Sequence, residues 1–414
     1  MLEQLWDSVL DFLKSSFLWL LGLLLIGLGV WQYPSIKQQL APMQENTHDN
    51  QLELGLSAKQ VAALIQRAEP STTNAFDWAN DLRTALEVNQ LPRSRENICA
   101  MIAVIDQESS FYANPAIPRL GEMSIQAIVK KLESIPMVGH FVNGSAQAFL
   151  ETHPTPETNY LNRIRHVKTE RDLDVVFRDM ISTLLESKGG SLLRDSQAVR
   201  DLTEGWNEID TLGSMQVSIN FATQVEEERR HRTLTLGEVW SLRDRMYTRK
   251  GGMDYGAVLL LGYQSGYTQK IYRFADFNAG RYASRNAAVQ AVVSSLLEKT
   301  LATDGDLLSY TADGTPAANM SNTEQAINEV IAKYKLGLSL AKVHADLLQE
   351  KTFEFNNTDT YQAIRAQYQK VKGKDAPYAL IPNIKLNSEK TSAILSTEKY
   401  ATTVNKRYQS CVKD

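Results

Sequence analysis

Glu108 is the residue whose type and position best suit chemistry. It lies in residues 96–111, where apolar residues from Ile98 to Ile105 recur at helical spacing and mark one face. Glu108 follows Met101 by seven residues and Ile105 by three, so it falls on or beside that buried stripe. Burial raises the pKa of an unpartnered carboxyl group, as a general acid near neutral pH requires. The alternative is a structural glutamate that caps or pairs at a helix end.

Two later segments combine tight turns with polar side chains. One is Gly213-Ser-Met-Gln216 and the other is Ala275-Asp-Phe-Asn-Ala-Gly280. With Glu108-Ser-Ser-Phe111 they form the ordered series Glu-Ser-x-Phe, Gly-x-Met-Gln and (Tyr/Phe)-Asn-Ala-Gly. This series resembles the motifs of the lytic transglycosylases of the lysozyme-like superfamily. Each motif is short, and the order of the three supports the resemblance.

The resemblance implies cleavage of the MurNAc–GlcNAc bond in peptidoglycan glycan strands by one carboxyl group. Glu108 is expected to act first as acid and then as base. The sugar's own 6-hydroxyl then attacks, which gives a 1,6-anhydro product without consuming water. Lysozymes commonly add a second carboxylate, which lytic transglycosylases do not need.

The resemblance also implies a set of substrate-binding residues. They are Ser109, Met215, Gln216, Phe277, Asn278, Gly280 and Tyr282. Ser109 matches the serine that orients the sugar or the acid, and the Gln216 amide suits an N-acetyl group. The alternatives are that Met215 is a core residue and that Asn278 and Gly280 form a helix-capping turn.

The sequence departs from the family pattern in two places. Gln216 lies 108 residues after Glu108 where the family has a short connection, so a helical insertion is expected at about residues 117–212. Phe277 stands where the family has a tyrosine, so a hydroxyl that could bond the acid is missing there, and Tyr282 or Tyr272 would have to replace it. Asp276 is either a second carboxylate or a cap or surface charge.

A narrower resemblance covers nearly the whole chain. The segments that carry it are Asn97-Ile-Cys-Ala, Gln107-Glu-Ser-Ser-Phe, Met215-Gln-Val-Ser and residues 272–286. They resemble an uncharacterised proteobacterial envelope family whose members are often lipoproteins. This second resemblance implies a location in the bacterial cell envelope and says nothing about activity.

Bulk properties exclude several classes of function. The 414 residues have a formal net charge of −4 and no long basic run, so nucleic acid is not an expected partner. The six histidines and two cysteines have no zinc spacing, and no Gly-rich phosphate loop occurs. No metal and no cofactor are therefore expected.

Residues 17–33 contain no charged side chain and are just long enough to span a bilayer. Trp19, Trp31 and Tyr33 suit interfacial positions. We predict an uncleaved signal anchor in the inner membrane, with an amphipathic start on the membrane surface and the globular part in the periplasm. A cleaved signal peptide and a buried core helix are the alternatives, and no cysteine follows that could carry a lipid.

The rest of the chain reads as mainly α. Residues 34–56 are a polar tether, residues 57–315 a lysozyme-like domain with the insertion, and residues 316–414 a helical C-terminal extension. Helices are expected from Ser57, as a capping box, to Ala68, and from a Ser94 cap through Glu108. Further helices are expected at residues 74–87, 123–134, 146–152, 172–187, 215–228, 236–247, 253–264, 274–297, 323–349 and 390–407. The pair Gly251-Gly252 is expected to break the chain.

The two cysteines are Cys99, within the Glu108 helix, and Cys411, near the C-terminus. In an oxidising periplasm an even pair is a disulfide candidate, and this bond would fasten the last helix to the Glu108 helix. Cys99 at an apolar helical position is alternatively a small core residue.

Three functions remain open. The first is a membrane-anchored periplasmic lytic transglycosylase, and the second is a hydrolase of the muramidase or chitinase type on the same fold. Asp276 placed with room for a water opposite Glu108 would favour the hydrolase. The third is a non-catalytic glycan-binding envelope scaffold, which the long insertion and Phe277 favour.

Overall fold

The computed structural model describes residues 55–133, 146–186, 196–207, 209–311, 314–386 and 395–413. Over these residues the chain is mainly α, as predicted. Its strands form two short antiparallel pairs, β1 (Thr211–Leu212) with β2 (Val217–Ser218) and β3 (Lys385–Leu386) with β4 (Leu395–Ser396). In this part of the chain no helix is both long and apolar enough to cross a bilayer. The anchor predicted at residues 17–33 lies outside the described residues.

The helices before the third motif are α2 (Ala58–Ala68), α3 (Ala75–Val88), α4 (Arg95–Ser109), α5 (Leu120–Glu133), α6 (Ala146–Thr152), α7 (Tyr160–His166), α8 (Glu170–Glu186), α9 (Gln197–Trp206), α10 (Ile219–Arg230), α11 (Leu236–Met246) and α12 (Arg249–Leu261). Those from the third motif onward are α13 (Lys270–Ala279), α14 (Ala283–Leu297), α15 (Asn322–Lys333), α16 (Leu340–Leu347), the 3-10 helix η5 (Glu354–Asn357), α17 (Asp359–Lys372) and α18 (Thr397–Lys413).

Side-chain caps start several helices where the sequence predicts them. Ser57 and Gln60 form the expected capping box of α2. The Ser94 hydroxyl accepts a hydrogen bond from the Asn97 amide at 3.3 Å and starts α4, the helix of Glu108. The local sequence therefore determines where the Glu108 helix begins.

The break expected at Gly251-Gly252 is wrong, because α12 runs through both glycines from its Thr248 cap. A Cβ atom on Gly252 would lie 2.9 Å from the Ser214 backbone nitrogen, and one on Gly251 would lie 2.1 Å from the Arg245 carbonyl oxygen. Gly252 thus lets the first turn of α12 lie against the Gly213-Ser-Met-Gln216 turn, and Gly251 lets it lie against the end of α11.

The single helix expected at residues 323–349 is also wrong, because α15 and α16 are separate helices. Between them Lys335 and Gly337 have left-handed backbones, with φ of 52° and 76°. Two such residues close together end a right-handed helix.

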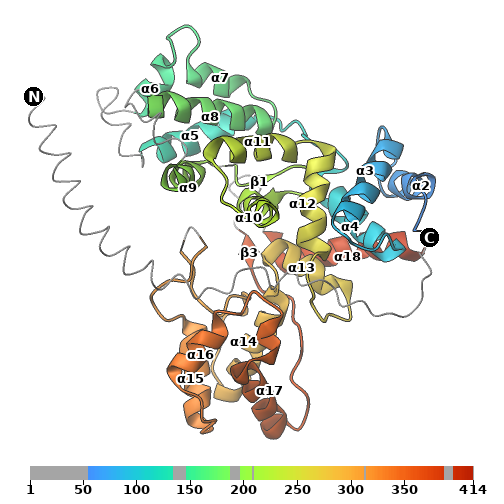
Figure 1. Cartoon of the computed structure of the whole chain (residues 1–414), viewed down its shortest axis with the longest axis vertical. Helices are drawn as coiled ribbons and strands as arrows, with labels where there is room; N and C mark the ends of the chain where they lie inside the picture. Colours follow the sequence, from blue (N-terminus) through green and yellow to red (C-terminus); the bar gives the residue numbers. More distant parts are fainter. Residues whose placement is uncertain are drawn as a thin grey trace, which may run out of the picture. The chain divides into compact units, whose positions relative to one another are not determined.

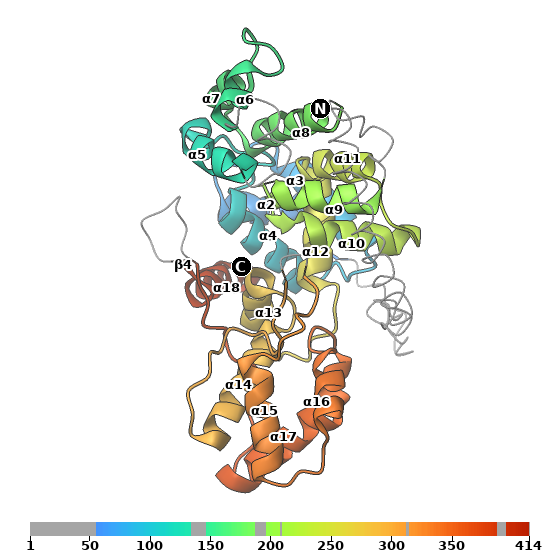
Figure 2. The same ribbon diagram turned by 90° about the vertical axis from the view of Figure 1, so that its left-hand side faces the viewer.

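Two hydrophobic cores divide the described chain, and the boundary does not lie near residue 315 as expected. The first core takes residues from α2 to α13 and then α18, while the second is built by α14 to α17 and the loops between them. Figures 1 and 2 show α14–α17 gathered as a group of their own and α18 returning to α4 and α13. The chain changes core between Phe277 and Val289, directly after the third motif.

The last helix is thus part of the first core and not of a separate extension. It packs along α4 and α13. Cys411 forms a disulfide with Cys99, and the two Cα atoms are 5.6 Å apart. The Arg407 guanidinium pairs with Asp106 at 2.8 Å and also donates to the Gln107 side chain. Helix α4 is therefore fastened to α18 at two places about two turns apart.

A buried ionic cluster joins α8, α9 and α11. The Arg243 side chain on α11 has no exposed surface. It donates to Asp174 on α8 at 2.7 Å and to Glu204 on α9 at 2.7 Å. Each carboxylate satisfies a guanidinium that would be costly to bury alone. The cluster therefore fixes α8 and α9 relative to α11.

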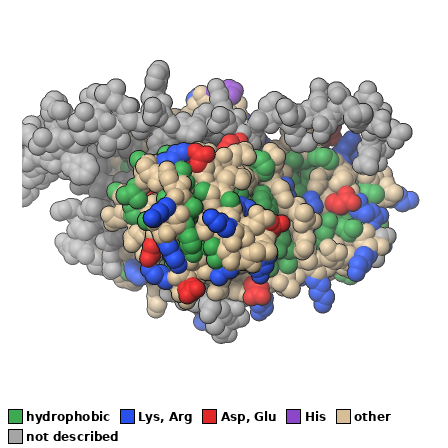
Figure 3. All heavy atoms as spheres, turned by 90° about the horizontal axis from the view of Figure 1, so that it is seen from below, with side chains coloured by type: hydrophobic (Ala, Val, Ile, Leu, Met, Phe, Trp, Pro, Cys, Tyr) green, Lys and Arg blue, Asp and Glu red, His purple; other side chains and the backbone are tan. Residues whose placement is uncertain are grey.

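The face of the molecule that is seen from below in Figure 3 has no dominant charge. There Lys and Arg side chains are interspersed with Asp, Glu and hydrophobic side chains (Figure 3). Such a mixed face has no single-sign field that would attract a polyanion.

We predict that the Cys99–Cys411 disulfide stabilises the fold strongly. It closes a loop of 312 residues, for which the chain-entropy model gives about 5 kcal/mol. Cys411→Ser should lower the free energy of unfolding by several kcal/mol in oxidising buffer. Urea denaturation measures this loss. The difference in stability between the wild type and the variant should vanish when the wild-type disulfide is reduced. Equal stability of the oxidised wild type and the variant would contradict the prediction.

Candidate active site

Glu108 is the penultimate residue of α4 and keeps part of its surface accessible. Enough protein surrounds its carboxyl group that burial raises the pKa to about 7, and the nearby Tyr400 hydroxyl partly opposes this rise. The carbonyl groups at the C-terminal end of a helix also disfavour a negative charge. A glutamate that is accessible and half protonated near neutral pH has the properties of a general acid.

The chain turns sharply after Glu108. Ser110 and Phe111 both have left-handed backbones, with φ of 47° and 61°. Phe111 is buried and packs edge-on against Trp78, with ring centroids 5.4 Å apart. A bulky residue in this conformation is strained and persists only where packing over-determines it. Phe111 thus secures the end of α4.

Ser109 joins the first motif to the second. Its buried hydroxyl lies 2.9 Å from the Ser214 carbonyl oxygen and 3.1 Å from the Ile105 carbonyl oxygen, and it can donate to either. The contact with Ser214 brings together two residues that are 105 positions apart in the sequence. Ser109 therefore positions two motifs against each other, and its hydroxyl faces protein groups.

The second motif is a tight turn between β1 and β2. Gly213 and Gln216 have φ of 77° and 49°, and the Gln216 amide N–H donates to the Gly213 carbonyl at 3.0 Å. The side-chain amide of Gln216 accepts from Thr211 at 3.0 Å. It donates to the Gly213 carbonyl at 3.2 Å and to Glu170 at 3.4 Å. Glu170 begins α8, so the start of this helix contacts the second motif.

Met215 lies in the core. Its side chain has no exposed surface, and a Cβ atom on Gly256 would lie 2.2 Å from its sulfur. The structure therefore places Met215 beneath the turn, where it packs against α12, and not at the surface that a sugar would approach. This placement matches the alternative that the sequence left open.

Asp276 of the third motif is a buried cap. It accepts from the hydroxyls of Tyr263 at 3.1 Å and Tyr267 at 2.7 Å. It also accepts from the backbone amides of Tyr282 at 2.9 Å and Ser284 at 2.7 Å, which begin α14. Burial raises the pKa of Asp276 despite these bonds. A carboxyl group that is 1% exposed and bonded four times cannot activate a water.

The remaining residues of the third motif have varied surroundings. Asn278 accepts from the Thr397 hydroxyl, at the start of α18, at 2.8 Å. Gly280 ends α13 with φ of 105°, and nothing lies within 4 Å of a Cβ built on it. The Tyr282 hydroxyl donates to the Gln264 carbonyl at 2.8 Å. Phe277 is 9% exposed and belongs to the first core.

Sequence reasoning missed the contribution of the last helix. Tyr400 approaches Glu108, Arg407 binds its two preceding residues, and Thr397 binds Asn278. The only signal for this arrangement was the cysteine pair, which placed α18 beside α4. Nothing in the spacing of Tyr400 indicated that it would face the carboxyl group.

Glu350 shows that a raised pKa alone does not mark a site. Burial raises its pKa to about 7 as well. However, its side chain has no exposed surface, and it accepts from the Leu308 amide at 3.1 Å, the Asn286 side chain at 3.1 Å and the Tyr310 hydroxyl. Glu350 holds the second core together, whereas Glu108 is accessible and lacks comparable donors.

A family model described as "Protein of unknown function (DUF1615)" matches residues 71–414. The chain belongs to this family. It is 34% identical over 367 residues to "Uncharacterized protein YaiW" of Escherichia coli (strain K12), a match that covers 87% of this chain and 92% of that protein. No solved structure matches. The matched region of the DUF1615 family includes all three motifs and the whole of α18.

The described residues contain no group of three or more His, Cys, Asp or Glu side chains that could hold a metal ion.

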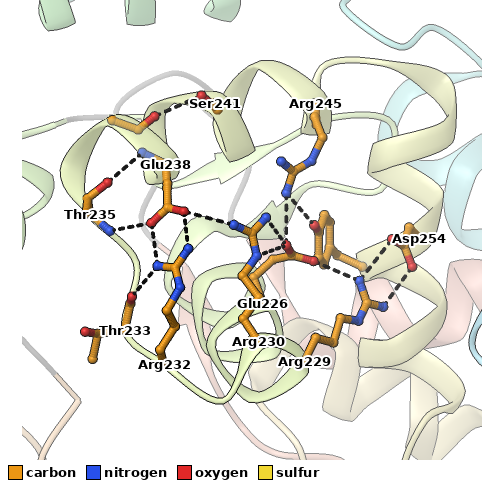
Figure 4. A network of polar contacts seen from close by, with 12 residues as sticks. Glu226, Arg229, Arg230, Arg232, Thr233, Thr235, Glu238, Ser241, Arg245 and Asp254 are labelled. Carbon is orange, nitrogen blue, oxygen red and sulfur yellow. Dashed lines mark hydrogen bonds and ion pairs between the residues drawn. The ribbon is translucent and has the colours of Figure 1, made fainter.

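An ionic network fixes α10, the helix that follows the second motif, to α11 and α12. Glu226 on α10 binds Arg230 at 2.9 Å, Arg229 at 3.1 Å and Arg245 at 3.2 Å (Figure 4). Burial alone would raise the pKa of Glu226, but hydrogen bonds from Tyr255, Arg229 and Arg230 and the charge of Arg245 hold it below the usual value. This network keeps α10, and with it the end of the second motif, in place.

We predict that Glu108→Gln stabilises the protein at high pH. The folded pKa of about 7 exceeds the unfolded value of 4.5, so the stability of the wild type falls as pH rises from about 4.5 through 7. Glutamine does not ionise. Urea denaturation should therefore give similar stability at pH 4 and a gain of about 3 kcal/mol for the variant at pH 9. Glu122→Gln, the same change on an exposed side chain, is the control, and a loss at pH 9 would contradict the assignment.

We predict the opposite pH dependence for Glu226→Gln. The folded pKa of Glu226 is depressed, so its contribution is complete above the unfolded value of 4.5 and is lost as pH falls through the folded one. The variant should lose about 2 kcal/mol of stability at pH 7, and this loss should shrink below pH 4. Glu151→Gln, at an exposed position, is the control. A loss that does not depend on pH would argue against the ionic network.

Proposed function

We propose that this protein is a membrane-anchored periplasmic lytic transglycosylase, with a lysozyme-like core, that cleaves the MurNAc–GlcNAc bond of peptidoglycan. The observation that supports it best is Glu108 itself. It is accessible, its pKa is raised to about 7 by burial, and it ends a helix that Ser109 joins to the second motif at 2.9 Å. These properties go together with the order of the three motifs.

A single carboxyl group near its pKa suits the proposed reaction. Protonated Glu108 gives its proton to the glycosidic oxygen as that bond breaks, which leaves a carboxylate. The carboxylate then takes the proton of the sugar's 6-hydroxyl as that oxygen bonds to the anomeric carbon. The acid is regenerated, no water is consumed, and both protonation states are accessible near neutral pH.

The hydrolase alternative loses its candidate residue. An inverting hydrolase needs a second carboxylate with room for a water, and a retaining one needs a carboxylate that can reach the anomeric carbon. Asp276 is sealed in the first core by two tyrosine hydroxyls and two backbone amides. The lytic reaction is therefore the better match to Glu108.

The proposed location rests on two features. The apolar segment at residues 17–33 would hold the chain in the inner membrane. The Cys99–Cys411 disulfide suits an oxidising compartment such as the periplasm. Glycan strands of peptidoglycan would be the partner, without a cofactor or a metal.

A second candidate is a non-catalytic glycan-binding scaffold of the envelope. Specific observations favour it: Met215 is enclosed, and the side chains of Gln216 and Asn278 are already bonded to protein groups. In this function the accessible face near Glu108 would bind a glycan without cleaving it.

The test is mass spectrometry of the muropeptides released from purified sacculi by the full-length protein. We expect 1,6-anhydro products from the wild type and their loss, by at least about 100-fold, in Glu108→Gln, which cannot donate the proton. Glu122→Gln is the matched control and should retain activity. Reducing-end products would indicate the hydrolase. Binding of sacculi without any product would indicate the scaffold.

A further inference from the structure

We propose that Tyr400, on the C-terminal helix, is the positioning residue that orients the Glu108 carboxyl group. The proposal rests on the proposed function for its catalytic consequence, but the pairing of the two side chains can be tested without any activity. It assigns a role to a helix that belongs to none of the three motifs.

The first argument is the unused hydroxyl of Tyr400. It is buried, and it makes no hydrogen bond of full geometry in the structure. The acidic group that it meets is Glu108, and this contact affects the pKa of both groups. A buried hydroxyl without a partner is costly, so a short movement that completes the bond to Glu108 is favourable.

Second, three tyrosine hydroxyls near the third motif are already used by other groups. Phe277 has none, and the Tyr282 hydroxyl donates to the Gln264 carbonyl at 2.8 Å. Tyr263 and Tyr267 donate to Asp276. Tyr282 was one of the two residues from which a replacement hydroxyl was expected, and it is engaged elsewhere. Tyr400 is the tyrosine that meets the acid.

The third argument is that α18 is held on both sides of Tyr400. Before it, the Thr397 hydroxyl donates to Asn278 at 2.8 Å. After it, Arg407 pairs with Asp106 at 2.8 Å, and Cys411 is bonded to Cys99. The position of Tyr400 along α4 is therefore fixed by contacts that do not involve Tyr400. Preorganisation of this kind is what a catalytic carboxyl group needs.

The chemistry assigns Tyr400 the role of a hydrogen-bond donor. Burial first, and then the adjacent Glu108 carboxyl, raise the pKa of Tyr400 well above its usual value. Tyr400 thus keeps its proton and is available to donate to Glu108 once the bond is completed, which would stabilise the carboxylate left after proton transfer. It opposes the effect of burial and keeps the pKa of Glu108 near neutrality.

Other charged groups around the pair come from several elements. Arg407 on α18 pairs with Asp106 on α4, and Glu69, directly after α2, acts on both. Glu170, at the start of α8, lies against Gln216 of the second motif. All of them are unchanged when only the Tyr400 hydroxyl is removed.

The test is a pH titration of Glu108 by carbon NMR in the full-length protein labelled at glutamate carboxyl groups. The Glu108 signal is assigned by its loss in Glu108→Gln. In Tyr400→Phe the pKa of Glu108 should rise by about one pH unit, because a donor to the carboxylate is lost. Tyr408→Phe, on the same helix with its ring against Phe274, is the control and should leave the pKa unchanged.

Alkylation of cysteines without reductant shows whether α18 is still docked in each variant. An unchanged or lower pKa in docked Tyr400→Phe would overturn the proposal, and so would an equal rise in Tyr408→Phe. If the wild type also cleaves glycan, the alkaline limb of its pH–rate profile should move upward by the same amount in Tyr400→Phe. Absence of cleavage would refute the proposed function alone, because the titration is independent of it.

Discussion

The arrangement of the first core depends on one costly constraint, a carboxyl group that the protein largely surrounds at the C-terminal end of a helix. Burial raises the pKa of Glu108 to about 7, so ionisation works against folding above neutral pH. Proteins retain such groups where function requires them. The neighbouring elements can be understood as supports that hold this carboxyl group accessible without letting it relax into water.

Support for Glu108 comes from three directions. The left-handed turn at Ser110 and Phe111 anchors the end of α4, and Ser109 ties it to the second motif. The glycines of α12 allow this helix to pack closely against the second motif. The ion pairs of Glu226 fix α10, the helix that follows the motif. From the other side α18 is fastened by Arg407 and by the disulfide at Cys411. The last helix is therefore a part of the site, although it is the most distant in sequence.

Local patterns in the sequence predict the local features well. Short-range patterns predict the Ser57 and Ser94 caps, the helix of Glu108 and the mainly α class. The structure contains each of these features. The sequence also indicated Cys99 and Cys411 as a disulfide candidate, with a free core cysteine as the alternative, and the structure has the bond.

The features that sequence reasoning missed are set by tertiary packing. Gly251 and Gly252 look like a helix break, but close packing requires them inside α12, Gly251 against the end of α11 and Gly252 against the second motif. The boundary expected near residue 315 followed turn-rich composition, whereas the chain actually changes core after the third motif and returns in α18. No spacing rule connects Tyr400 with Glu108, because about 290 residues separate them and only the fold brings them together.

The most direct test of the account is a crystal structure of the Glu108→Gln variant with a peptidoglycan tetrasaccharide. We predict that the glycan lies across the accessible end of α4, with a MurNAc–GlcNAc glycosidic oxygen within hydrogen-bond reach, about 3 Å, of the side chain at position 108. A glycan bound elsewhere on the chain, or one bound there with every glycosidic oxygen beyond the reach of residue 108, would contradict the claim that Glu108 is the acid.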